Sequence, residues 1–173
     1  YYTYEQKNTK KTVTKTVRQV VDEALDTLSI LQLSDGNFES WGEENAESTA
    51  QVMVALTALG IDPLKDKRFV KKGNTLLDGI LKFKMKDGGF VHSKTYNPEN
   101  PTSLPDESNT MASEQVLYAL ISLYRFEEGY RSLYDFRPEM NSDLKEQIDT
   151  IKQSIDNLPA KLPNKDTTHI NDV

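Results

Sequence analysis

Hydrophobic residues recur at helical spacing in five segments of the chain, which predicts five helices. Segments 12–33 and 70–85 each have one apolar face. Segments 46–59 and 110–126 are apolar on nearly every side, which is typical of helices that are buried on every side. Segment 142–158 carries one narrow apolar stripe. Because no segment alternates convincingly with period two, we predict an all-α fold.

The remaining segments are polar or rich in turn-forming residues. We expect residues 1–11 to form an N-terminal arm or linker and residues 12–158 to form one helical domain. Residues 159–173 are expected to be a C-terminal linker. The long loop over 87–109 contains a proline-rich stretch without hydrophobic periodicity, which predicts an irregular, exposed segment of the kind that is often functional.

Two parts of the chain repeat one another, about 12–60 and 70–126, each with an Asp-Gly-x-Phe loop followed by an apolar helix. Each unit is expected to hold an amphipathic outer helix, the loop and a nearly all-apolar inner helix. Alternating half-exposed and buried helices build two concentric layers. The matched residues are Asp35, Gly36, Phe38 and Gln51 in the first unit, and Asp87, Gly88, Phe90 and Gln115 in the second.

The run from Gln32 through Gly36 to Phe38 resembles the Gln-Trp motif of squalene and terpene cyclases. With the helix that follows, it resembles the wider prenyltransferase and squalene-oxidase repeat group. The resemblance covers about residues 12–138 and implies an α/α toroid, here a partial ring. It is similar, more narrowly, to repeat-bearing surface proteins of Gram-positive bacteria. That resemblance alone implies a cell-surface or extracellular location, and the composition is equally compatible with the cytoplasm.

The chain departs from the catalytic members of that group. It has no Asp-x-Asp-Asp motif and no cysteine, so the acid motif, the zinc site and the thioester are all missing. We therefore predict no catalytic residues, no metal and no cofactor, and a non-catalytic helical binding or scaffold module. Two alternatives stay open: a fragment of a toroid enzyme acting on a polysaccharide or isoprenoid, and a helical dimerisation domain that pairs through the stripe in 142–158.

The net charge of −6 argues against nucleic acid as the main partner. No stretch reaches the roughly 20 apolar residues that a membrane-spanning helix needs. Because the chain begins with Tyr1, we expect it to be part of a larger parent chain. Its partner is an unknown ligand or protein, with carbohydrate as one candidate.

The loop FESWGEENAE places Glu43, Glu44 and Glu47 around Trp41, the one tryptophan of the chain. An aromatic platform with nearby carboxylates suits a carbohydrate or a cation. The alternative is that Trp41 packs against helix ends. The glutamates would then interact with the positive N-terminus of the following helix.

His92 shares the long loop with Tyr96 and Asp106. A histidine near carboxylates can act as a general base or a metal ligand, and the alternative is a solvated side chain. Gln51 and Gln115 lie on predicted buried helices and must therefore be hydrogen-bonded. We expect them to tie each inner helix to its loop, with a ligand-facing role as the alternative.

Overall fold

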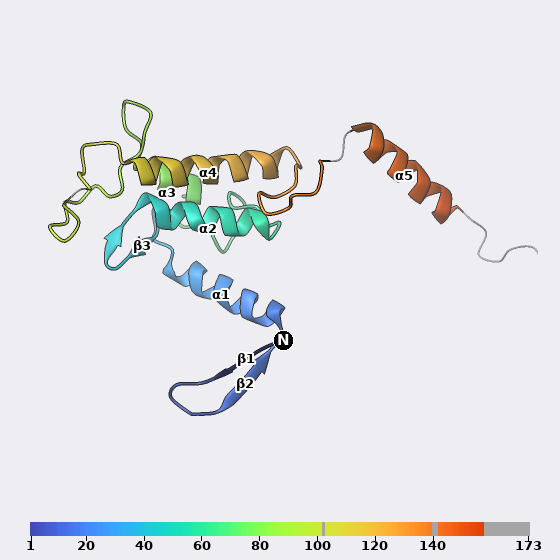
Figure 1. Cartoon of the computed structure of the whole chain (residues 1–173), viewed down its shortest axis with the longest axis horizontal. Coiled ribbons are helices and arrows are strands. Elements are labelled where there is room, and N and C mark those ends of the chain that lie inside the picture. Colours follow the sequence, from blue (N-terminus) through green and yellow to red (C-terminus); the bar gives the residue numbers. More distant parts are fainter. Residues whose placement is uncertain (102, 140–141, 158–173) are drawn as a thin grey trace, which may run out of the picture. The chain divides into compact units, whose positions relative to one another are not determined.

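The computed structural model describes residues 1–101, 103–139 and 142–157, and the predicted linker 159–173 lies outside them. The described residues form five helices and two antiparallel two-stranded sheets (Figure 1). The helices are α1 (Val17–Leu31), α2 (Ala46–Ala58), α3 (Leu76–Leu81), α4 (Thr110–Glu127) and α5 (Ser142–Asp156). The strands are β1 (Tyr2–Glu5), β2 (Thr12–Lys15), β3 (Glu39–Ser40) and β4 (Glu43–Glu44). The chain divides into two units, Tyr1–Phe136 and Arg137–Val173.

The prediction of an all-α toroid is wrong, because the fold is mixed α/β. β1 and β2 form a hairpin in which Tyr4 pairs with Val13 and Thr3 with Thr14. Tyrosine, threonine and valine favour strands, and this local preference prevails over the weak helical pattern at 12–15. The first helix therefore begins only at Val17, after Thr16, which accepts a hydrogen bond from the Gln19 N–H in a capping box.

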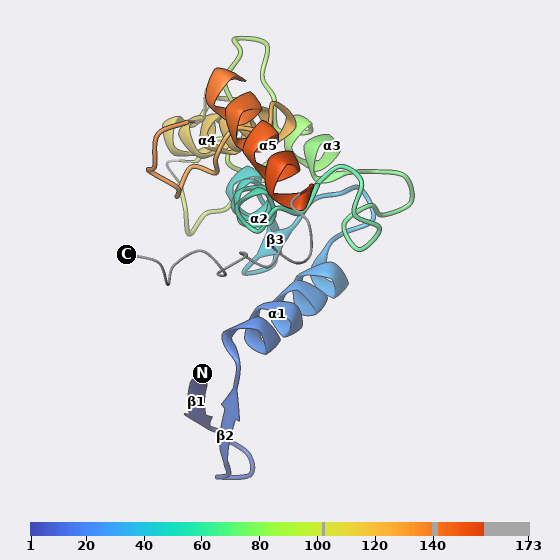
Figure 2. The same cartoon turned by 90° about the vertical axis from the view of Figure 1, so that its right-hand side faces the viewer.

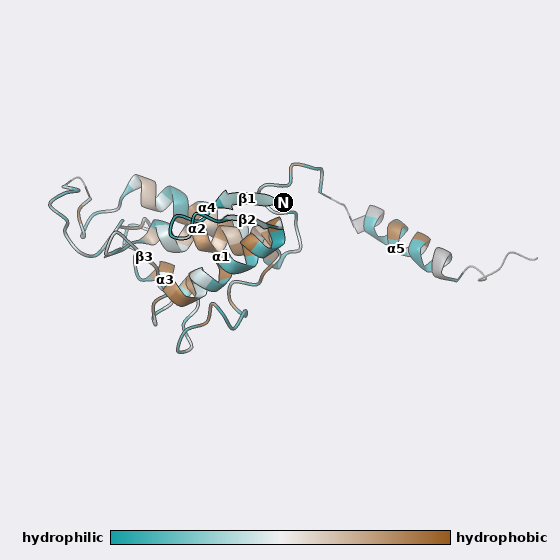
Figure 3. Ribbon diagram, turned by 90° about the horizontal axis from the view of Figure 1, so that it is seen from below, coloured by the Kyte–Doolittle hydropathy of each residue, from teal (hydrophilic) through white to brown (hydrophobic). Residues whose placement is uncertain are grey.

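The predicted outer helix over 70–85 is reduced to the short helix α3, which is strongly hydrophobic (Figure 3). The chain turns before it, where Gly73 has a φ of 87°. Thr75 caps α3 by accepting from the Asp78 N–H. Because one six-residue helix replaces the expected outer helix, the second sequence repeat (about 70–126) does not reproduce the outer layer of the first repeat.

Gly36 and Gly79 are in close contact where the first loop lies against α3. A Cβ atom on Gly79 would lie 2.6 Å from the carbonyl oxygen of Gly36. A side chain at either position would therefore push the loop away from the helix. This contact fixes the loop that leads into β3.

The hydrophobic core is centred on α2, which packs against both α4 and α3. Its residues Met53 and Leu56 are fully buried, as are Phe69 and Phe83 from the segments around α3. α2 and α4 lie side by side in both views (Figures 1 and 2). The prediction that 110–126 is buried on every side is wrong, because one face of α4 is exposed.

The two Asp-Gly-x-Phe loops adopt the same turn. The Asp35 carboxylate accepts a hydrogen bond from the backbone N–H two residues later at 3.1 Å, and Asp87 does so at 3.0 Å. Gly36 and Gly88 follow with φ values of 88° and 93°. Glycine adopts positive φ without steric cost, which explains the Asp-Gly pair in both loops.

The loops also join their helices in the same way. The Phe38 N–H donates to the Thr49 hydroxyl at 3.0 Å, and the Phe90 N–H donates to the Ser113 hydroxyl at 2.9 Å. In each sequence repeat, the phenylalanine carbonyl accepts a hydrogen bond from the backbone N–H of the asparagine that caps the next helix. The matched residues therefore share one loop-to-helix geometry, although the helices that precede the loops differ.

Gln51 and Gln115 bond to each other, since the Gln51 Nε2 donates to the Gln115 Oε1 at 2.9 Å. Both are therefore hydrogen-bonded, as expected, but the expectation that they are buried is wrong, because Gln51 is exposed and Gln115 is half-buried. They link α2 to α4 rather than helix to loop. The loop contact is made by Gln32, a buried residue whose Nε2 donates to the carbonyls of Gly36 and Phe69 at 3.1 and 3.0 Å.

The second compact unit, Arg137–Val173, contains α5, along which hydrophobic and hydrophilic residues alternate (Figure 3). Ile151 of its apolar stripe is exposed, and Ile148 is half-buried. The side chains of Leu144 and Ile155, and the whole of Leu158, lie outside what is described. Among the helices in the described part of the chain, none combines the length and apolar character needed to cross a membrane, as predicted.

Candidate binding cleft

Trp41 occupies the tip of the β3–β4 hairpin, in the two-residue turn with Gly42. Both residues have positive φ, 56° and 79°, as in the turns that match the twist of a tight hairpin. Glycine is suited to this conformation, whereas tryptophan adopts it rarely. The turn holds the indole fully exposed, so the alternative in which Trp41 packs against helix ends is wrong.

A cleft of about 590 Å³ lies between this hairpin and residues 93–98. Four of the seven predicted ligand residues line it: Trp41, Glu43, Glu44 and Tyr96. The Tyr96 side chain is also exposed. The remaining wall residues are Glu39, Gly42, Lys82, Phe83, Ser93, Lys94, Thr95, Asn97 and Pro98.

A hydrogen bond crosses the cleft between its two walls. The Asn97 amide Nδ2 donates to the Glu43 carboxylate at 3.1 Å. The Asn97 Oδ1 in turn accepts from the Glu99 N–H at 2.9 Å, which fixes the orientation of the amide. The 93–98 segment is thereby held against the hairpin.

Lys82 anchors the base of the hairpin. Its ammonium group donates to the Glu44 carboxylate at 2.8 Å and to the Asp35 carboxylate. The Asn37 amide donates to the same Glu44 oxygen at 3.2 Å. Two carboxylates of the repeat loop and hairpin thus share one cation.

This cluster shifts the protonation equilibria of its members. Burial acts to raise the pKa of the Asp35 carboxyl, but the hydrogen bonds from Lys82 and from the Asn37 N–H outweigh it, and the pKa is lowered. Burial acts to lower the pKa of Lys82, and its two carboxylate partners reverse this, so the pKa is raised. Both groups are therefore charged at neutral pH.

Glu47 and His92 form a separate pair beside the cleft. Both carboxylate oxygens of Glu47 lie 2.9 Å from the Nδ1 of His92, and both side chains are largely buried. The His92 carbonyl also accepts from the Ala46 N–H at 3.0 Å, at the first residue of α2. The pair fastens the second loop to the start of α2, so His92 is not a solvated loop residue.

Asp106 lies away from these groups. It lines a different cavity of about 710 Å³ together with Asp87. There the Ser108 hydroxyl donates to Asp87 at 2.7 Å and lowers the pKa of that carboxyl, helped by the Gly89 N–H. Asp106 is therefore not part of the cleft that contains Trp41.

The sequence did not indicate Lys82 or Asn97 as site residues. Both reach the cleft from segments far from the hairpin in sequence, and no local pattern links them to it. The one local signal is the Asn-Pro-Glu run at 97–99, which is typical of a turn. Within the described residues, no three His, Cys, Asp or Glu side chains converge as metal ligands would.

Comparison of the chain with protein-family models, curated proteins and solved structures yields no match. The resemblance of Gln32, Gly36 and Phe38 to a repeat motif stays a prediction. The chemistry of the cleft itself is therefore the basis for assigning a function.

Proposed function

We propose that the chain is a non-catalytic binding module whose ligand site is the cleft between the β3–β4 hairpin and residues 93–98. The observation that carries this proposal is the exposure of Trp41. A tight turn holds the Trp41 indole fully exposed at the rim of a cleft. Moving an indole from water into an apolar contact is favourable, and a ligand in the cleft would provide that contact.

The cleft chemistry fits a carbohydrate. The indole of Trp41 and the ring of Tyr96 offer apolar surfaces for the C–H faces of a sugar. Glu43 and Asn97 offer a carboxylate and an amide for hydroxyl groups, and their mutual hydrogen bond orients both before a ligand arrives. The volume of about 590 Å³ lies within the usual range for small-molecule sites.

The positions of the acidic side chains favour binding over catalysis. Glu44 is paired with Lys82, and Glu47 is paired with His92 outside the cleft. Asp106 lines another cavity. The enzyme alternative requires Glu43, Glu44, Glu47 and Asp106 to converge with His92 or Tyr96 on one substrate. Glu43, Glu44 and Tyr96 share the cleft, whereas the Glu47–His92 pair lies outside it and Asp106 lines another cavity.

The proposal includes a place for the module on a Gram-positive bacterial surface or in the extracellular space. What supports this part is the sequence resemblance of the repeat loop and helix to surface-protein repeats. A carbohydrate-binding cleft would be consistent with that place. Detection of the parent protein in surface-shaved or secreted fractions, against a cytosolic marker, tests this part separately.

Calorimetric titration of the chain with neutral oligosaccharides tests the proposed site. We expect Trp41→Ala to weaken binding about tenfold, because removal of a stacking ring costs about 1.4 kcal/mol. Phe136→Ala is the matched control, since Phe136 is an exposed aromatic residue that does not line the cleft. Equal affinity of the Trp41 variant and the unmodified chain would refute the assignment of this cleft.

A further inference from the structure

A second hollow lies next to the ligand cleft, between the end of α1 and the start of α2. Its volume is about 470 Å³, and we call it the α1–α2 groove. In Figure 1 the end of α1 lies below the start of α2. The groove has an apolar wall made by Leu28, Leu31, Phe38 and Val52.

The apolar wall of the groove is open to a ligand on its α1 side. Leu28 and Leu31 are three positions apart and therefore lie on one side of α1. Leu28 is half-buried, and Leu31 is 58% exposed. Phe38 and Val52 are buried and form the floor of the wall. Covering Leu31 would remove apolar surface from water, which is favourable.

Two polar side chains of the groove are already hydrogen-bonded within the protein. The Glu47 carboxylate is bonded to His92, and the Gln51 amide donates to Gln115. Both residues line the groove together with the apolar wall. A further sugar unit in the groove would therefore have to compete for these groups, whereas a hydrocarbon chain would not.

The groove and the cleft meet at strand β3, because Glu39 lines both of them. Glu39 is exposed, so its carboxylate can accept a hydrogen bond from a ligand hydroxyl at this junction. A second connection is the bond from Glu47 to His92, which directly precedes Ser93 of the cleft wall. A ligand in the polar cleft thus has an apolar groove beside it.

We propose that the ligand of the cleft is a neutral glycolipid, with its sugar in the cleft and its hydrocarbon chain in the α1–α2 groove. This inference rests on the proposed function and names the ligand class. A polar site joined to an apolar groove suits an amphiphile, because the chain and Leu31 leave water together. The carboxylates of Glu39 and Glu47 border the groove, so an anionic amphiphile is disfavoured.

Calorimetric titration with methyl, butyl, hexyl and octyl maltoside, each below its micelle concentration, tests the groove. Affinity should rise with chain length, by up to roughly fourfold for each methylene that leaves water. Leu31→Asp should remove most of this rise and leave the affinity for methyl maltoside unchanged. Ile30→Asp is the matched control and should keep the rise, since Ile30 is an exposed apolar residue of α1 that does not line the groove.

Trp41→Ala should weaken binding of every maltoside, because the sugar of each occupies the cleft. Octyl maltoside that binds this variant as tightly as the unmodified chain would overturn the inference, since the chain would then bind without the sugar. Dodecyl sulfate below its micelle concentration should bind more weakly than octyl maltoside, and tighter binding would contradict a neutral ligand.

The outcomes separate this inference from the proposed function. Equal affinity for methyl and octyl maltoside, or a rise that Leu31→Asp retains, would overturn the glycolipid and leave the cleft as a sugar site. Absence of binding by every maltoside would also overturn it, and the titration with neutral oligosaccharides then decides the proposed function by itself. Circular dichroism checks that Leu31→Asp is folded. If it is not, the chain-length series on the unmodified chain decides.

Discussion

The Asn97 side-chain amide donates a hydrogen bond to the Glu43 carboxylate at 3.1 Å and so joins the two walls of the cleft. The two residues come from the long loop and from strand β4, far apart in sequence. Their contact holds residues 93–98 against the hairpin, next to the point where His92 is fastened to the start of α2. It also orients a carboxylate and an amide toward the space that Trp41 borders.

Asn97→Ala should weaken ligand binding more than it weakens the fold. Loss of the bond frees residues 93–98, whereas a partly exposed hydrogen bond contributes only about 1 kcal/mol to stability. Urea denaturation measures the free energy of unfolding, and calorimetry measures affinity. Glu43→Gln keeps an acceptor for the Asn97 amide and removes only the charge that Glu43 offers to a ligand, so it should preserve the link. An Asn97→Ala variant that binds as tightly as the unmodified chain would contradict the role of the link.

Removal of one member of the Glu47–His92 pair should be clearly destabilising. Glu47→Ala leaves a largely buried imidazole without its partner, which costs about 1–3 kcal/mol. A double-mutant cycle with His92→Ala, followed by urea denaturation, measures the coupling. We expect the second substitution to cost much less in the Glu47→Ala background. Strict additivity of the two single changes would contradict a direct interaction between them.

The Asp35–Lys82 contact should make stability depend on pH at both extremes. The pKa of Asp35 is lowered in the fold, so its contribution is present above the ordinary carboxyl pKa of about 3.9 and is lost as pH falls through the lower folded value. The pKa of Lys82 is raised, so its contribution is complete below about pH 10 and is lost at higher pH as the folded pKa is passed.

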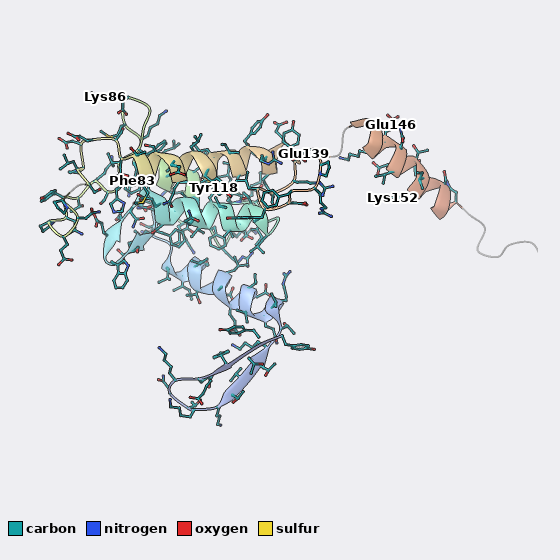
Figure 4. All side chains as sticks on the ribbon, in the orientation of Figure 1. Phe83, Lys86, Tyr118, Glu139, Glu146 and Lys152 are labelled. Atoms are coloured by element: carbon teal, nitrogen blue, oxygen red, sulfur yellow. The ribbon has the colours of Figure 1, made fainter. Side chains whose placement is uncertain are left out.

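Thermal melts of Lys82→Met between pH 2 and pH 6 test the acid limb. The unmodified chain should lose more stability on acidification than the variant, which lacks the partner that lowers the pKa of Asp35. Lys86→Met is the matched control, since Lys86 is an exposed lysine four positions after Lys82 in the sequence (Figure 4). Parallel pH profiles for the unmodified chain and Lys82→Met would argue against the role of the contact.

Gly79→Ala should destabilise the protein by about 2 kcal/mol, because its methyl group would collide with the Gly36 carbonyl across the loop–helix contact. Gly88→Ala provides the comparison, since its positive φ is strained for alanine but the space around it is open. That strain costs about 1 kcal/mol. Denaturant midpoints should therefore fall further for Gly79→Ala. The reverse order would mean that the backbone conformation matters more than the close approach.

Helical periodicity located α2 and α4 closely, because both have apolar residues at helical spacing and an asparagine cap that begins them. It misjudged segment 1–15, where strand-forming residues pair across a turn, and segment 70–85, where Gly73 interrupts the helix. Periodicity describes one helix at a time. It therefore could not show that the two similar helices are covered to different extents.

Part of the cleft was predictable from the sequence. The acidic loop around Trp41 is a local pattern, and it indicated Glu43 and Glu44 correctly as neighbours of the tryptophan in space. The contributions of Lys82 and Asn97 depend on tertiary contacts that no local spacing encodes. The exposure of Trp41 depends on a positive φ in its turn, a conformation that its residue type does not favour.

Trp41 is the single tryptophan among the 173 residues, so its emission spectrum reports on the cleft alone. Fluorescence titration of the unmodified chain with a panel of neutral oligosaccharides is the most direct test of the binding proposal. We expect a saturable blue shift with at least one oligosaccharide, as the indole leaves water, and loss of that shift in Asn97→Ala. An emission spectrum that stays that of a solvated indole with every oligosaccharide would contradict it.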